Sequence, residues 1–164
     1  MKIFTLFLFL SLFTSIHLTA QTRERYFINQ DTSQQPLILV DSLQTDINYL
    51  FLDANKVQAI DVFKDAAAIK QFGERGKNGV VVIKTKANVS LLRLPELLEK
   101  YNLPDSVKKL RVCINEILVK RPELLLIDET KIRGVGTMAL IDWNYVNKPT
   151  DETVINISVE KSEL

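Results

Sequence analysis

The hydrophobic positions of this chain fall into short runs divided by polar turns, a pattern that favours short strands over long helices. β-Branched residues, which strands prefer, are concentrated in several of these runs. The sequence therefore predicts six main strands, over Leu37–Val40, Val57–Phe63, Val80–Lys86, Arg111–Val119, Lys131–Trp143 and Thr153–Lys161. The fifth strand is expected to be bulged at Gly134 or Gly136.

Two short helices are predicted between the strands. Asp65–Phe72 is rich in alanine, with Asp65 placed to cap its start and Gly73 to end it. Leucines spaced three and four apart predict a second helix that begins near Leu94. Leu43–Asp53 is interpreted as a short strand or turn followed by a loose helical turn. Together these elements predict an α+β fold of small mixed β-sheets with short helices.

The two halves of the sequence resemble each other at a nearly constant spacing. Val40-Asp41 matches Ile114-Asn115 at an offset of 74, and the matches that follow keep an offset of 74 or 75. They are Leu52–Val57 with Ile127–Ile132, and Val80–Lys86 with Val154–Glu160. Such self-similarity predicts two β-rich units in tandem, residues 36–88 and 89–164, the second degenerate and led by its own helix. The alternative is that two small β-rich pieces share this spacing by chance.

The first twenty residues have the composition of a cleavable secretory signal peptide. Lys2 precedes the apolar run Ile3–Phe13, and the small residues Thr19 and Ala20 precede the predicted cut before Gln21. A retained membrane anchor is the alternative. The polar stretch 21–35 then reads as an extended mature N-terminus. We therefore predict export, with no membrane span after cleavage.

Charge and composition argue against several classes of function. The chain has 21 basic and 20 acidic residues, and loss of Lys2 with the signal leaves 20 of each. A neutral protein has no electrostatic footprint for nucleic acid or anionic lipid. Cys113 is the single cysteine, which excludes an internal disulfide, and its apolar surroundings favour a buried thiol. His17, the only histidine, leaves with the signal, and no cofactor or metal site is predicted.

Three regularly spaced glycines lie between the first helix and the next strand. Gly73, Gly76 and Gly79 recur every three residues, where a tight loop must turn the chain. Glycine tolerates positive φ in such a loop, and Asn78-Gly79 is a favourable turn pair. Arg75 is expected to be exposed at the tip of this glycine loop.

Three segments, Pro36–Ser42, Val57–Ala68 and Phe72–Lys86, resemble the plug domain of TonB-dependent outer-membrane receptors in the SusC/RagA-like form of Bacteroidetes. The plug-motif residues are Val40, Asp41, Lys64, Asp65, Phe72, Gly73, Arg75, Gly76, Asn78 and Gly79. The resemblance implies a plug-like fold and a place in the bacterial cell envelope, either periplasmic or associated with the outer membrane.

The chain departs from that family at three points. Ser42 stands where the family has glycine after Val-Asp, and Phe72 where it has tyrosine. A receptor barrel needs many strands of about ten residues, and 164 residues leave no room for one. The resemblance therefore implies a plug-like module without its barrel and without transport. The family carries no catalytic residues that transfer to this chain.

Two kinds of chemistry compete with an interaction role. The glycine loop follows a helix and precedes a strand, which is the opposite polarity to a phosphate-binding loop. The carboxylates are scattered and read as turn and cap residues. A pair of them facing each other in a cleft would instead make the protein a carboxylate-based envelope hydrolase.

The leading hypothesis is a non-enzymatic interaction module that binds a protein partner of the envelope through a free sheet edge. The candidate edge residues are Val80, Val82 and Lys84, and Thr153–Lys161 offers a second candidate edge. Besides the hydrolase, the other alternative is a barrel-less remnant of a TonB-dependent receptor. The sequence predicts neither the partner's identity nor the oligomeric state.

Overall fold

The computed structural model describes residues 34–142 and 148–160, so the predicted signal peptide and most of the predicted extended segment lie outside the described residues. The first unit contains β1 (Leu37–Val40), β2 (Leu43–Thr45), β3 (Leu50–Phe51), β4 (Val57–Phe63), α1 (Asp65–Phe72) and β5 (Val80–Thr85). The second contains β6 (Leu91–Leu92), α2 (Leu94–Lys100), α3 (Asp105–Lys108), β7 (Val112–Ile114), β8 (Ile117–Leu118), β9 (Leu126–Asp128), β10 (Ile132–Asp142) and β11 (Lys148–Val159). Short 3-10 turns link them: η2 (Ile47–Tyr49), η3 (Ala54–Lys56), η4 (Gly73–Gly76), η5 (Pro122–Leu124) and η6 (Glu129–Lys131).

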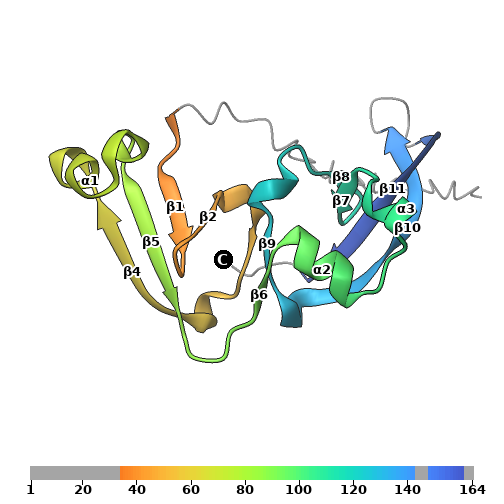
Figure 1. Ribbon diagram of the computed structural model, residues 1–164, viewed down its shortest axis with the longest axis horizontal. Helices are drawn as coiled ribbons and strands as arrows, with labels where there is room; N and C mark the ends of the chain where they lie inside the picture. The colour runs from red at the N-terminus through yellow and green to blue at the C-terminus, as the bar shows by residue number, and fades with distance from the viewer. Residues whose placement is uncertain (1–33, 143–147, 161–164) are drawn as a thin grey trace, which may run out of the picture.

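The strands form mixed sheets accompanied by short helices, which confirms the α+β class (Figure 1). The first unit has the strand order β2-β1-β5-β4, and the second has β8-β7-β11-β10. In both sheets the first strand pairs antiparallel with the second and parallel with the last. The last strand also pairs antiparallel with the long strand before it. The two sheets therefore have one topology.

The turns that open the two units also have one geometry. Asp41-Ser42 and Asn115-Glu116 each join two strands through a pair of residues with positive φ, at 47° and 74° in the first unit and 47° and 71° in the second. The side chain at the first turn position ties the turn to the last strand of its sheet. Asp41 Oδ1 accepts from the Thr85 N–H at 3.0 Å, and Asn115 Oδ1 accepts from the Val159 N–H at 2.9 Å; both residues of the second bond lie 74 positions after those of the first. The structural equivalence thus follows the sequence offset.

A third sheet joins the units, with the order β3-β9-β6. β3 of the first unit runs parallel to β9 of the second, pairing Leu50 with Leu126. Each core takes a side chain from the other unit: Tyr49 belongs to the larger cluster around Leu97 and Ile155, and Leu126 to the smaller cluster. Because the units exchange core residues, they are packed together (Figure 1).

Two reciprocal ion pairs cross the same junction. Lys131 Nζ lies 2.5 Å from Asp53 Oδ1, and Lys56 Nζ lies 2.5 Å from Asp128 Oδ2. The two lysines are equivalent positions 75 residues apart, and so are the two aspartates. Lys131 and Asp128 are buried, at 2% and 0% exposure. Burial raises the pKa of Asp128, but hydrogen bonds from Lys56 and Thr130 outweigh it and hold that pKa below its usual value.

Several predicted elements differ in detail from the structure. Asp65 does not cap α1: it is the first helical residue, with φ of 52°, and the cap position is Lys64, which makes no side-chain capping bond. Gly73 ends α1 as predicted, with φ of 64°. β11 already begins at Lys148, before the predicted start at Thr153, because it pairs with the far end of β10. The second helix begins at Leu94, as predicted.

Candidate functional site

The glycine loop packs tightly against α1. A Cβ atom added to Gly76 would lie 2.6 Å from the backbone oxygen of Ala68, so only glycine fits there. Gly79 has φ of 89°, which glycine adopts readily. Beside the loop, the rings of Phe63 and Phe72 meet edge to face at 5.3 Å. These contacts give the glycines and Phe72 a structural role in seating α1 on the sheet.

The polar plug-motif residues tie the glycine loop to the first hairpin. Arg75 Nη2 donates to Gln44 Oε1 at 2.8 Å, and Asn78 Nδ2 donates to the Gln35 carbonyl at 3.5 Å. Asp41 holds its turn to β5, as described above. The other members differ in exposure, since Val40 is buried whereas Lys64 and Asp65 are exposed. The structure thus brings most of the motif together as a scaffold around β1 and β5.

The predicted partner edge is wrong. β5, which carries Val80, Val82 and Lys84, lies between β1 and β4 and is hydrogen-bonded on both sides. β11 likewise lies between β10 and β7, with Ile155–Ile157 paired to both, so the described part of the second candidate edge is not free either. In each unit the opening strand inserts in parallel beside the last one, a long-range pairing that the local sequence pattern does not reveal. Lys84 also lies 3.6 Å from Asp61, as an exposed ion pair.

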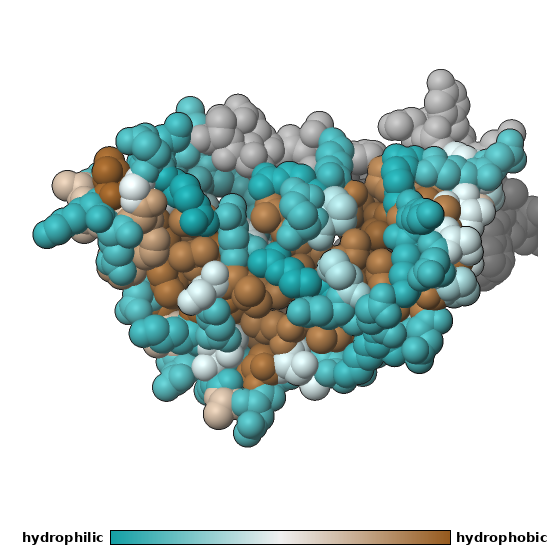
Figure 2. Space-filling view, in the orientation of Figure 1, coloured by the Kyte–Doolittle hydropathy of each residue, from teal (hydrophilic) through white to brown (hydrophobic). Residues whose placement is uncertain are grey.

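The edge strand on that side of the first sheet is β4. Within the described residues no strand pairs with its outer edge. Ile60 lies opposite Ile83 and Val62 opposite Val81, so both side chains are on the sheet face that carries the smaller core cluster. Both are 57% exposed. We call Ile60, Val62 and the outer edge of β4 the β4 surface; Figure 2 shows hydrophobic residues gathered over this side of the molecule and towards its middle.

The second unit covers the equivalent face. Val135 faces Ile157 across the strand pair as Ile60 faces Ile83, at equivalent positions in the two units. Val135 is partly buried against the larger cluster, to which α2 contributes Leu97 and Leu98. α3 adds Val107 to the same packing. Among the described residues no α-helix precedes β1, so no described element of the first unit corresponds to α2 and α3.

The lobe formed by β4, α1, the glycine loop and β5 is basic. Residues 57–86 contain six basic and three acidic residues, a net charge of +3. The rest of the chain after residue 20 contains 14 basic and 17 acidic residues, a net charge of −3. The neutral total therefore hides a charge asymmetry centred on the lobe that carries the β4 surface.

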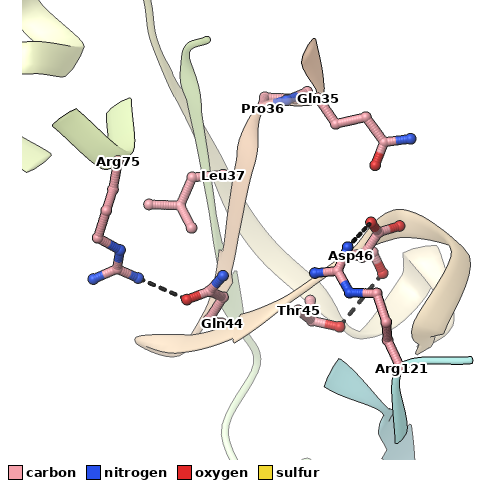
Figure 3. A pocket seen from close by; sticks show the side chains of 8 residues that line it. All are labelled: Gln35, Pro36, Leu37, Gln44, Thr45, Asp46, Arg75 and Arg121. Atoms are coloured by element: carbon pink, nitrogen blue, oxygen red, sulfur yellow. Dashed lines mark hydrogen bonds and ion pairs between the residues drawn. The ribbon is translucent and has the colours of Figure 1, made fainter. Parts of the chain in front are cut away.

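A polar cavity of about 240 Å³ lies where the two units meet (Figure 3). It is lined by Arg75 and Arg121 together with Asp46, whose Oδ2 lies 3.9 Å from Arg121 Nη1. Asp46 is the only carboxylate among the lining residues, so this cavity does not assemble the carboxylate pair that a hydrolase needs. A second cavity of about 230 Å³, between Tyr49, Phe51 and Ile117, has no acidic lining residue.

The single thiol is buried, as predicted. Cys113 is fully inaccessible and unpaired. Burial raises the pKa of its thiol, which keeps it protonated at neutral pH. In the described ranges no group of three or more potential metal ligands is found.

Sequence reasoning missed the β4 surface. Its signal was present as Ile60 and Val62 on either side of the polar Asp61 in the predicted strand Val57–Phe63. Apolar residues two positions apart lie on the same face of a strand, and an apolar face is normally expected to be buried in the core. Only the sheet order and the missing cover reveal that this face is open.

One curated protein is similar to part of the chain. It is a TonB-dependent receptor of Formosa agariphila, 38% identical over 56 residues. The similarity covers 33% of this chain and 6% of the receptor. No family model and no solved structure matches the chain. Among the described residues, none of the helices has the length and apolar character required to cross a bilayer.

Proposed function

We propose that this protein is an exported, non-enzymatic, plug-like interaction module of the bacterial cell envelope that binds a protein partner through the β4 surface. The proposal rests on two features of β4: no strand of the described residues pairs with its outer edge, and two apolar side chains on one of its faces, Ile60 and Val62, are each 57% exposed. The partial similarity to a TonB-dependent receptor supports the plug-like character. That similarity and the predicted signal peptide support the envelope location.

The energetics favour a covered β4 surface. Full burial of an isoleucine or valine side chain stabilises by roughly 1.5–3 kcal/mol, so covering the exposed half of each contributes about 1 kcal/mol. Soluble proteins usually protect an edge strand with charge, proline or a covering element. The only charged residue within β4 is Asp61, and its carboxylate already lies beside Lys84, so it gives the edge little protection. A partner that covers Ile60 and Val62 would gain this burial.

A second candidate rests on the same receptor similarity. The chain would then be a barrel-less remnant of a TonB-dependent receptor that keeps the plug scaffold without a partner of its own. The two candidates differ in one property: a binding module has an occupant on the β4 surface in the cell, and a remnant has none.

Site-specific photocrosslinking tests the proposal. A photoreactive amino acid is placed at Ile60 in the full chain expressed in its native host, and adducts are identified by mass spectrometry. The matched control is Thr137 on the edge strand β10. It lies opposite Ile155 of β11, just as Val62 of β4 lies opposite Val81 of β5. We expect one protein to be crosslinked from position 60 and not from position 137. No adduct from position 60, with the protein present in the envelope fraction, would refute the proposal and favour the remnant.

A further inference from the structure

We infer that the β4 surface accepts a short, acidic amphipathic helix presented by the partner, seated where α2 and α3 lie on the second unit. This inference rests on the proposed function and specifies the chemistry of the occupant. It depends on the internal equivalence of the two sheets, on the exposure of Ile60 and Val62, and on the charge of the surrounding lobe.

The second unit supplies the template for this occupant. Its sheet face carries Val112, Ile155 and Ile157, which correspond to Ile38, Val81 and Ile83 of the first unit at an offset of 74. That face is covered by helices whose apolar positions recur three and four residues apart, as in Leu94, Leu97 and Leu98. Because the two sheets have the same strand order and pairing, the first unit presents an apolar face equivalent to the one that the helices cover in the second unit.

In the first unit the inner part of this face is already covered. Leu52 and Leu126 pack with Ile38, Val40 and Ile83 in the smaller cluster, so these three positions are buried. Exposure rises most towards β4, at Ile60 and Val62, and less at the other edge of the sheet, where Leu43 lies opposite Val40 and is 39% exposed. The uncovered strip is therefore narrow and lies at the outer end of the face, which suits one helix rather than a second sheet.

Charge selects an acidic helix. The lobe that carries the strip has a net charge of +3. Lys64 is exposed and follows Val62 by two residues in extended backbone, whereas α1 with Lys70 packs on the opposite face of the sheet, against Leu37 and Val80. Complementary charge on the partner would accelerate encounter and disfavour basic competitors. The occupant is thus expected to combine leucines at helical spacing with glutamate or aspartate on its flanks.

Peptide binding to the full mature chain tests the inference. The probe is a fluorescein-labelled 16-residue peptide with leucines at helical spacing and glutamates between them; one comparison peptide has lysines in place of the glutamates, and another alternates valine and glutamate as a strand. We expect the acidic helical probe to bind best, to gain helical circular dichroism when bound, and to weaken with added salt. The double variant Ile60→Ser, Val62→Ser is expected to lower its affinity by about tenfold or more. Thr137→Ala, on the equivalent strand of the second unit, should change it by less than about twofold.

Other outcomes overturn the inference in distinguishable ways. Tighter binding of the strand peptide would replace helix docking by strand addition to β4. If neither peptide binds but Ile60 crosslinks to a partner in the cell, the occupant has a different chemistry and the proposed function still stands. A crosslink from Ile60 to residues 21–33 of the same chain would show that the protein covers its own surface, which refutes both proposals. Circular dichroism of each variant establishes that loss of binding is not loss of fold.

Discussion

Replacing Gly76 by alanine tests the packing that the plug-motif glycines provide. The added Cβ would lie 2.6 Å from the backbone oxygen of Ala68, 2.8 Å from its carbonyl carbon and 3.3 Å from the Cβ of Phe72. The closest contacts are to the backbone of α1, so no side-chain rotation relieves them. The loop and the helix must instead move apart, which loosens the cluster of Leu37, Ala68 and Val80 beneath them.

The magnitude follows from the kind of clash. Overpacking of a well-packed site costs 1–3 kcal/mol, and a contact with rigid backbone belongs at the upper end, so we expect about 3 kcal/mol for Gly76→Ala. For a protein of this size that corresponds to a fall in Tm of about 10 °C. Gly73 offers a comparison, because an added Cβ there has nothing within 4 Å but the residue has φ of 64°. Gly73→Ala is expected to cost about 2 kcal/mol from backbone strain alone, because φ of 64° with ψ of −152° is a conformation that essentially only glycine adopts.

Urea unfolding of the mature chain, followed by circular dichroism, measures these differences in the free energy of unfolding. Gly136→Ala is the matched control, since a Cβ at Gly136 has nothing within 4 Å and the backbone φ is not positive. This control is expected to stay within about 0.5 kcal/mol of the wild type. A Gly76→Ala protein as stable as the control would show that the glycine loop does not pack on α1 as described.

Three further predictions concern the turns and the junction. Ser42→Gly and Glu116→Gly should each stabilise the protein by about 0.5–1 kcal/mol in urea unfolding, because both residues have positive φ that glycine adopts without strain; destabilisation by either would contradict the turn geometry. Asp53→Ala should destabilise by about 3 kcal/mol by leaving buried Lys131 unpaired, and adding Lys131→Met should recover most of that loss; no recovery in thermal melts would argue against the pair. The pKa of Asp128 is lowered in the folded state, so its ionised form adds stability above the unfolded pKa of about 3.9 that is lost as pH falls through the folded pKa. The stability gap between the wild type and Asp128→Asn should therefore narrow in acid unfolding curves, and a gap that widens below pH 4 would contradict this sign.

Local pattern predicted the elements well because their causes are local. The apolar run Leu37–Val40, the alanine-rich helix ending at Gly73 and the leucine-spaced helix from Leu94 all depend on neighbours within a few residues. The repeat offset of 74 was likewise visible, since matching turns such as Asp41-Ser42 and Asn115-Glu116 need similar short-range chemistry. The predicted signal peptide is also a local property, and it stays a prediction.

The tertiary structure alone decided which strand is free and which charges are buried. β5 has the stronger strand pattern, yet it is interior because β1 inserts beside it from about forty residues earlier, and this leaves β4 at the edge. A lysine such as Lys131 is placed on the surface by composition, but pairing with Asp53 of the other unit stabilises it in a buried position. Likewise, Ile60 and Val62 have the sequence pattern of core residues, and they are exposed because no helix before β1 covers them in the described chain. Sequence determines what each segment prefers over a few residues, whereas sheet order and cover depend on contacts between segments far apart in the chain.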